Sequence, residues 1–411
     1  MEAHQRIALG AGAATTSETI ATMPGGSPDF SLVLGGPLFQ AFRRTHLSDD
    51  ALELLARRVV VISTFCWLPL LILSITERRA VGGVVVPFLY DIDLHMRFLL
   101  AMPLMIIAEL VVHKRLAHVV TRFEEYELIP ASEKPRYDAI VRAALGLRNS
   151  ILAELLLLAF VYGFGVLYLW RGHLALSTAT WYGDPAAGRV NLTRTGMWYV
   201  YVSLPFFQFL LFRWYFRLFI WGRLLWQTAR IKLNLIPMHP DGVGGLGFLS
   251  HIVYAFSPLL LAHGCILAGL FLNRILYMGA SLGDFKMDIL GAVIFLLLIL
   301  LGPLMFFTPQ LAAAKRAASR EYGVLAEQYV RDFNAKWLAD GSKEELLGAV
   351  DIQSLADMGN SYQTVRTMRP VPFTKETIIQ LVILTLAPVV PVTLTMISFD
   401  ELLKKLLGIL F

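Results

Sequence analysis

Two arginines stand inside a strongly apolar stretch of the chain, at residues 212–221. Arg213 and Arg217 are four residues apart, so a helix places both on one face, one turn apart. A guanidinium group within a lipid bilayer is costly and needs a reason to be there. Glu109 and Glu154 lie in two other apolar stretches and are the natural counter-charges. These four residues are therefore predicted to line a pathway or a substrate site.

An alternative interpretation places the same arginines at the membrane surface. Long basic side chains can extend, or snorkel, to the headgroups, and the basic run continues through Arg223 and Arg230. Tryptophans gather at that interface. The candidates for such an aromatic belt are Trp214, Trp221 and Trp226.

The last apolar stretch, at residues 376–398, is a second candidate for a pathway. Pro388 and Pro391 should kink a helix there and free carbonyl groups, which membrane depth tolerates only against protein or a water-filled path. Two hydroxyl side chains, Thr393 and Thr395, lie close by. These residues are predicted to line a pathway, with a simple kink as the alternative.

The strongest local motif is a glycine-rich turn at residues 239–247. Glycine backbone at a helix start exposes N–H groups that suit an anion. The alternative is a tight turn whose aspartate caps the next helix. The residues concerned are His239, Asp241, Gly242, Gly244, Gly245 and Gly247.

Neither a catalytic set nor a metal site is predicted. His251 and His263 would lie about 18 Å apart along one helix and about 120° apart around it, so they cannot share one metal. Each is still a candidate haem ligand with a partner elsewhere. No P-loop, dinucleotide-binding or zinc-protease motif occurs in the sequence, which leaves the cofactor unknown.

The elements that must position these residues are membrane-spanning helices. Of the 411 residues, 56% are hydrophobic and 16% charged, and the mean hydropathy is +0.60, more than a soluble fold can bury. Runs of roughly 20 apolar residues match a hydrocarbon layer about 30 Å thick and lack the alternation of barrel strands. The net charge of +5 forms no nucleic-acid-like patch. The predicted fold class is an all-α polytopic transmembrane helix bundle.

Seven spans are expected, and the distribution of basic residues orients them. Lys and Arg collect in the connections after spans two and six, which predicts that the N-terminus is inside and the C-terminus outside. The spans are residues 59–75, 97–113, 151–170, 197–220, 248–272, 287–308 and 376–398. The chain divides into a disordered or amphipathic tail (1–50), the first six spans (51–308), a cytoplasmic helical layer (309–370), and the last span with an amphipathic tail (371–411). The composition favours a bacterial inner membrane.

Two of the helices are predicted to extend beyond the membrane. Residues 206–236 contain no proline or glycine-rich breaker, so span four should be about 45 Å long. Span six should continue as one helix into the cytoplasm, because apolar residues recur at helical spacing between Leu311 and Trp337.

Three stretches of the sequence resemble an uncharacterised bacterial multi-pass membrane protein family. They are residues 192–196 leading into Trp198 and Tyr199, residues 203–209, and the turn at 239–247. The resemblance covers most of the chain and implies no activity. A second resemblance is architectural: seven spans, an inside N-terminus and a cytoplasmic helix before the last span are similar to insect chemoreceptor-type ion channels. That resemblance implies a tetramer whose last helix lines the pore.

The leading functional hypothesis is a homo-oligomeric channel or facilitator for small ions. One alternative is a membrane-anchored sensor or scaffold that binds a partner through its cytoplasmic helices. The other is a haem-binding or lipid-modifying membrane enzyme. The expected partners are the lipid bilayer, small ions and further copies of the chain, with no nucleic acid.

Overall fold

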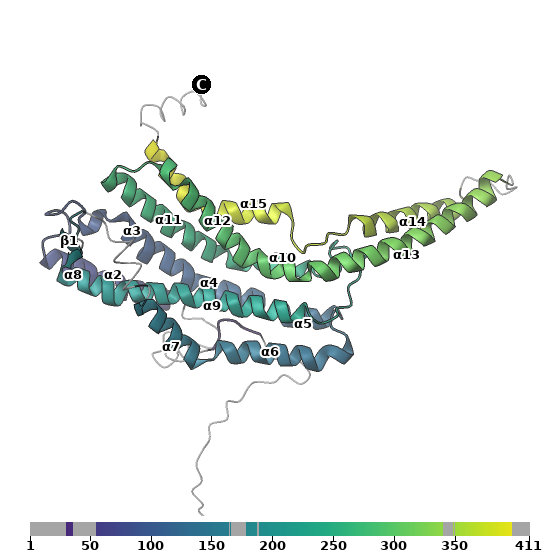
Figure 1. Ribbon diagram of the computed structural model, residues 1–411, viewed down its shortest axis with the longest axis horizontal. Coiled ribbons are helices and arrows are strands. Elements are labelled where there is room, and N and C mark those ends of the chain that lie inside the picture. The colour runs from purple at the N-terminus through teal and green to yellow at the C-terminus, as the bar shows by residue number, and fades with distance from the viewer. Residues whose placement is uncertain are drawn as a thin grey trace, which may run out of the picture.

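The architecture is a bundle of long helices with a helical arm at one end (Figure 1). In this computed structural model the described residues are 30–35, 55–163, 165, 178–186, 189–339, 348 and 350–396. We call the end from which α13 and α14 project the arm side, and those two helices the arm. The short β-hairpin, in which β1 pairs antiparallel with β2, lies at the opposite end.

The helices and strands follow one another along the chain with short connections. They are α2 (Leu55–Thr76), η1 (Phe88–Tyr90), α3 (Ile92–His95), η2 (Met96–Ala101), α4 (Met102–Leu116), α5 (Val119–Glu125), η3 (Ala131–Glu133), α6 (Lys134–Arg148), α7 (Ile151–Phe160), β1 (Gly183–Ala186), β2 (Arg189–Leu192), α8 (Arg194–Trp198), η5 (Tyr199–Ser203), α9 (Leu204–Thr228), α10 (Phe248–Val253), η6 (Tyr254–Phe256), α11 (Ser257–Met278), η7 (Leu282–Phe285), α12 (Lys286–Leu301), η8 (Gly302–Phe307), α13 (Thr308–Asn334), η9 (Ala335–Ala339), α14 (Val350–Thr367), α15 (Lys375–Leu386) and η10 (Ala387–Met396).

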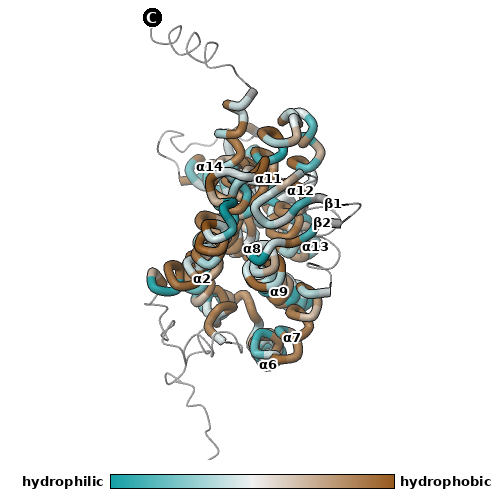
Figure 2. Tube along the Cα trace, turned by 90° about the vertical axis from the view of Figure 1, so that its left-hand side faces the viewer, coloured by the Kyte–Doolittle hydropathy of each residue, from teal (hydrophilic) through white to brown (hydrophobic). Residues whose placement is uncertain are grey.

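Among the described residues, six helical stretches are long and apolar enough to cross a membrane, which indicates an integral membrane protein. They are Leu55–Thr76, Ile92–Glu125, Arg194–Thr228, Phe248–Met278, Leu282–Leu338 and Lys375–Thr395. A bent pair, Ala131–Arg148 with Ile151–Gly163, would raise the number to seven. Apolar colours run along α2 and α11 in Figure 2. Six of the predicted spans coincide with these candidate helices, while the third, at 151–170, lies partly outside the described residues. The exact number of spans stays a prediction. The orientation of the termini stays a prediction.

The two predicted helix extensions have different outcomes. Span six does continue, as helix from Leu282 to Leu338. Span four does not reach residue 236, because α9 ends at Thr228. The Gln310 side chain donates to the carbonyls of Ala229 (2.6 Å) and Ile231 (2.7 Å) and accepts from the N–H of Leu233 (3.1 Å). These hydrogen bonds with Gln310 take the place of the backbone hydrogen bonds that would continue α9. The local sequence could not indicate them, because Gln310 lies far along the chain.

The arm is a helical hairpin in which α14 packs against α13. Asp351 at the start of α14 accepts hydrogen bonds from Trp337 Nε1 (3.2 Å) and Lys336 Nζ (2.8 Å), and Tyr329 donates to the Asp351 carbonyl. Within the predicted layer at 309–370, α13, η9 and α14 are helical. Its position in the cytoplasm stays a prediction.

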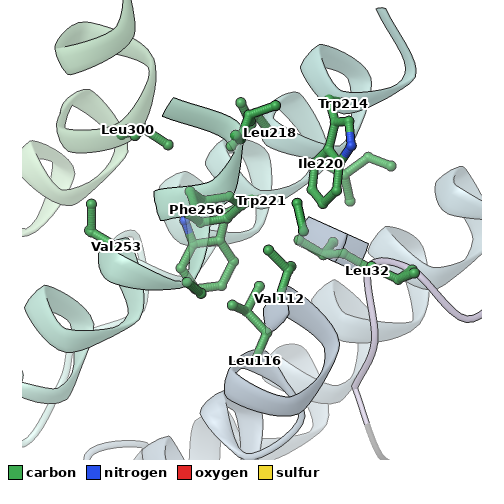
Figure 3. Close-up of a cluster of buried hydrophobic side chains, with 14 of the residues drawn as sticks. Leu32, Val112, Leu116, Trp214, Leu218, Ile220, Trp221, Val253, Phe256 and Leu300 are labelled. Carbon is green, nitrogen blue, oxygen red and sulfur yellow. The ribbon is translucent and has the colours of Figure 1, made fainter. Parts of the chain in front are cut away.

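Residues 30–35 belong to the core, although the sequence placed them in a disordered tail. Phe30, Leu32 and Val33 are each 1% exposed. Figure 3 shows Leu32 beside Val112 of α4 and Ile220 of α9, in one cluster of buried apolar side chains. The helices α4 and α9 thus provide apolar side chains for this segment, and Arg148 of α6 binds its Ser31 carbonyl. The composition of the tail does not reveal this site. The rest of the tail lies outside the described residues.

The last span changes its helical form where the prolines occur. α15 ends at Leu386 and the chain continues as the 3-10 helix η10 from Ala387, immediately before Pro388. This element packs along α11. Gly264 of α11 allows the approach, since a Cβ there would lie 2.3 Å from the Thr385 carbonyl oxygen.

Candidate functional site

Five charged side chains from four helices meet inside the bundle. Arg217 Nη2 lies 2.8 Å from Glu109 Oε1, and Arg213 Nη1 lies 3.6 Å from the same oxygen. Arg58 pairs with the other oxygen of Glu109. Arg213 Nε also lies 3.4 Å from Glu154 Oε1. We call these five residues the arginine cluster, and the four that the sequence singled out do converge.

The cluster exists because its helices present charged residues at matching heights. Arg58 and Glu154 stand near the first residues of α2 and α7, while Glu109 lies at the middle of α4. Arg213 and Arg217, one turn apart on α9, face the other three. Arg58 is the member that the sequence did not select, because it precedes its apolar run and has the pattern of an ordinary flanking cation.

Burial excludes the interpretation that the arginines snorkel to the membrane surface. Arg213 is 5% exposed and Arg217 is 3% exposed. The predicted aromatic belt is also wrong for two of its members, since Trp214 and Trp221 are buried core residues. Trp214 donates to the Met105 carbonyl at 3.0 Å, and its ring lies 4.8 Å from the Arg217 guanidinium carbon. Only Trp226 has an exposed ring.

Two small enclosed cavities adjoin the cluster, and Arg213 and Arg217 line both of them. Each has a volume of about 10 Å³, close to what one water molecule requires. The first lies toward α2 and α4 and is also lined by Arg58 and Glu109. The second lies toward α6 and α7 and is also lined by Arg148, Glu154, Leu32 and Gly35.

Residues 30–35 close the second cavity. Arg148 donates to the Ser31 carbonyl at 2.5 Å, and the Ser31 hydroxyl lies 3.0 Å from His113 Nδ1. Gly35 has φ +134°, and a Cβ at that position would lie 2.5 Å from Asn149 Oδ1 and 2.6 Å from Arg148 Nη2. Only glycine fits this backbone without displacing its neighbours.

The second cavity is rich in positive charge. Three guanidinium groups line it, from Arg148, Arg213 and Arg217, together with one carboxylate, that of Glu154. Guanidinium donors arranged around a small space favour water or a small anion. Because the walls exclude bulk water, the charge is screened less there than at a surface.

The glycine-rich turn already contains an anion of its own. The Asp241 carboxylate accepts N–H bonds from Val243 (2.8 Å), Gly245 (3.2 Å) and Gly247 (2.7 Å). Burial raises the Asp241 pKa, but these three donors and His239 lower it more, so the net pKa lies below its usual value. His239 Nδ1 is 3.0 Å from the same carboxylate. The turn therefore folds around Asp241, as the tight-turn alternative predicted. The predicted helix cap is wrong, because Gly247 is the N-cap residue of α10 and, among the described residues, no side chain caps that helix.

Positive backbone φ angles make the glycines of this turn necessary. They are +65° at Gly242, +67° at Gly244 and +95° at Gly245. Arg369, between α14 and α15, donates from its side chain to the Asp241 carbonyl and from its backbone to the Gly242 carbonyl. The motif thus joins the arm to the bundle.

The threonines of the last span do not face the arginine cluster. Thr393 donates to the Val390 carbonyl and Thr395 to the Val392 carbonyl, both within η10. Both hydroxyls are therefore satisfied by carbonyls three residues earlier in the same helical segment. Pro391 is exposed, whereas Pro388 lies against Gly264. A role of the last span in a pathway stays a prediction.

The two candidate haem ligands have different surroundings. His263 is buried, its Nδ1 lies 2.7 Å from the Leu259 carbonyl, and its Nε2 lies 2.6 Å from the Tyr215 hydroxyl. Both ring nitrogens are therefore occupied. His251 is exposed on α10. Over the described ranges, no three His, Cys, Asp or Glu side chains are placed to hold a metal ion.

A second buried acid lies at the end of the bundle away from the arm, and sequence reasoning missed its partners. Asp91 accepts from Asn273 Nδ2 (2.7 Å), Trp181 Nε1 (2.7 Å) and the Leu94 N–H (3.0 Å). Asn273 in turn accepts from the Ile92 N–H at 3.0 Å. The partners are 90 and 182 residues away in sequence, so no local pattern connects them.

Comparison with known proteins assigns the chain to no family. No protein-family model matches it, and no curated protein and no solved structure is significantly similar to it. The two resemblances drawn from the sequence therefore stay predictions. What the chain does must be inferred from its own geometry.

Proposed function

We propose that this chain is a membrane facilitator for small anions, with the arginine cluster as its central site. The observation that carries the proposal is the second cavity, where three guanidinium groups and one carboxylate surround a space inside the bundle. Buried ionisable groups at membrane depth are costly and most often serve a substrate or ion. The excess of guanidinium groups at this cavity selects anions over cations.

The two cavities suggest how an anion would move. Arg213 and Arg217 form their common boundary, so an ion could pass from one cavity to the other while it keeps contact with the same guanidinium groups. Glu109 and Glu154 hold those groups in place and compete with the ion, which keeps its binding weak. Conduction requires such a balance between entry and release.

The described conformation is closed. Each cavity has room for about one water molecule, and residues 30–35 fill the space beside the second one. The Arg148 bond to the Ser31 carbonyl holds this segment in place. Displacing the segment would therefore open the second cavity.

The test is anion efflux from liposomes that contain the purified full chain, measured with chloride and nitrate. Gly35→Ala should raise the flux, because its Cβ collides with Arg148 and Asn149. Gly82→Ala is the matched control, since a Cβ there meets no atom within 4 Å. Arg213→Gln should lower anion flux roughly tenfold, because the anion loses one charge-assisted hydrogen bond.

A gain of flux cannot come from misfolding if anion selectivity is kept. Arg320→Gln, which removes an exposed cation from the arm, should behave like the wild type. Flux equal to that of empty vesicles in both the wild type and Gly35→Ala would overturn the proposal. Flux that prefers cations would overturn the role of the arginines.

A second candidate function is a membrane scaffold in which the arms of two copies pair. The observation that favours it is a set of exposed apolar side chains on the arm and on η9, which continues α13. Val324 of α13, Leu338 of η9 and Val350 of α14 are 62%, 74% and 76% exposed. Figure 1 shows the arm projecting well beyond the bundle. Val324→Asp should then convert a dimer into a monomer in lipid nanodiscs, measured as particle mass. A wild-type chain that is already monomeric would remove this candidate.

A further inference from the structure

An open groove lies on the surface of the bundle between α9 and the end of α12 with η8. Its volume is about 760 Å³, and its lining is apolar, with side chains such as Phe219, Leu298 and Phe306. Gly222 and Pro303 form its floor, where a Cβ on the glycine would lie 3.4 Å from the proline ring. Arg223 is the single charged residue that lines it.

The groove has the length of one membrane leaflet. On α9 it runs from Tyr215 to Trp226, which is roughly 16 Å at 1.5 Å per residue. Half of a hydrocarbon layer about 30 Å thick is about 15 Å. Both α9 and α12 run toward the arm side, so Trp226 marks the end of the groove nearest the arm. An acyl chain of the arm-side leaflet therefore matches the groove in length and in polarity.

Two cations stand at the end of the groove nearest the arm. The Arg230 guanidinium carbon lies 3.8 Å from the centre of the Trp226 ring. Within the described ranges, neither Arg223 nor Arg230 is ion-paired with a carboxylate. An arginine in this position binds a phosphate oxygen with two parallel N–H donors. A second cation beside it adds attraction for a headgroup that carries a net negative charge.

We propose that this groove binds one anionic phospholipid, with an acyl chain against Phe219 and Leu298 and the headgroup phosphate on Arg223. Arg230, held on the Trp226 ring, faces the remaining negative charge. The site is separate from the arginine cluster and does not depend on anion flux. Lipid bound there would stiffen the contact between α9 and η8, next to the start of the arm.

Native mass spectrometry of the full chain, purified in detergent, tests the site directly. Phosphatidylglycerol and phosphatidylcholine with identical acyl chains are added, and the bound lipids are counted. The wild type should retain one phosphatidylglycerol in preference to phosphatidylcholine. Arg223→Gln should weaken that binding roughly tenfold, and Arg320→Gln should leave it unchanged.

A pair of glycine variants separates the groove from the rest of the lipid-facing surface. Gly302, the first residue of η8, lines the groove, whereas Gly291 lies in α12 and does not line it. A Cβ at either position meets no atom within 4 Å. Gly302→Phe fills the groove and should remove the retained lipid, whereas Gly291→Phe should not. Retention by Gly302→Phe, or no effect of Arg223→Gln, would overturn the proposal. A dimer that only Gly302→Phe breaks would show that a second copy of the chain occupies the groove.

Discussion

Glu109 and Asp91 are both almost fully buried, with exposures of 4% and 5%, yet they are held by opposite kinds of partner. Eighteen residues separate them along one nearly continuous helical stretch, which places them about 27 Å apart. Glu109 is surrounded by the guanidinium groups of Arg58, Arg213 and Arg217. Within the part of the chain that the structure describes, Asp91 accepts hydrogen bonds from neutral donors alone.

The difference separates a structural acid from a functional one. Neutral N–H groups satisfy Asp91 without adding charge, and they fix three distant segments, around residues 91, 181 and 273, to one another. Glu109, the acid nearer the arm, is instead surrounded by three guanidinium groups, which is more positive charge than its carboxylate neutralises. Because cavities adjoin these cations, a ligand can share them. Surplus charge beside an enclosed space is what we take as the sign of function.

The largest expected effect is that of Glu109→Ala. This change leaves buried guanidinium groups without their central counter-charge, which costs about 3–5 kcal/mol in unfolding free energy. The unfolding free energy of the detergent-solubilised chain measures it. Added nitrate should restore part of the loss, because an anion that binds only the folded state stabilises it. A loss below about 1 kcal/mol would mean that water already reaches the arginines.

Asp91→Asn should cost less, about 1–3 kcal/mol, because the amide group turns an NH₂ toward one of the three donors. The same unfolding measurement applies. Nitrate should not restore this variant, and its anion flux in liposomes should equal that of the wild type. If nitrate rescued Asp91→Asn as well as Glu109→Ala, the distinction between the two acids would fail.

The sequence predicted the cluster in part, because the cost of charge in an apolar environment can be read from composition. Arg213, Arg217, Glu109 and Glu154 each interrupt an apolar stretch, and they meet as expected. Arg148 was not selected, since nothing local shows that a cation at the end of α6 will bind the Ser31 carbonyl.

The fold shows the same limit. Six spans could be located because a membrane imposes a length on apolar runs. The end of α9 at Thr228 could not, because it depends on hydrogen bonds from Gln310, about 80 residues later in the chain. The burial of residues 30–35 depends likewise on a site that three other helices provide. Sequence periodicity reports what a segment can form alone, and these features need a partner.

Asp241 offers the smallest test of the comparison. Its carboxylate accepts from three backbone N–H groups, which are neutral donors like those of Asp91, but it lies within reach of water. Its side chain is 18% exposed, and its pKa lies below the usual value. An unfolded aspartate has a pKa of about 3.9. The stabilisation by Asp241 is therefore complete above that pH and is lost as the pH falls from there through the lower pKa of the folded state.

Thermal midpoints of the wild type and Asp241→Asn between pH 6 and pH 3 check this. The variant should be less stable by about 1 kcal/mol at pH 6, the net worth of a typical hydrogen bond, and the gap should close toward pH 3. Asp288→Asn, at an exposed position early in α12, is the control and should show no such gap. A gap that stays constant with pH would mean that the negative charge of Asp241 is irrelevant to the turn. Neutral N–H donors would then hold Asp241 through the geometry of their hydrogen bonds, whether or not the side chain is charged. The negative charge of a buried acid would matter for stability only where arginines surround it, as they do Glu109.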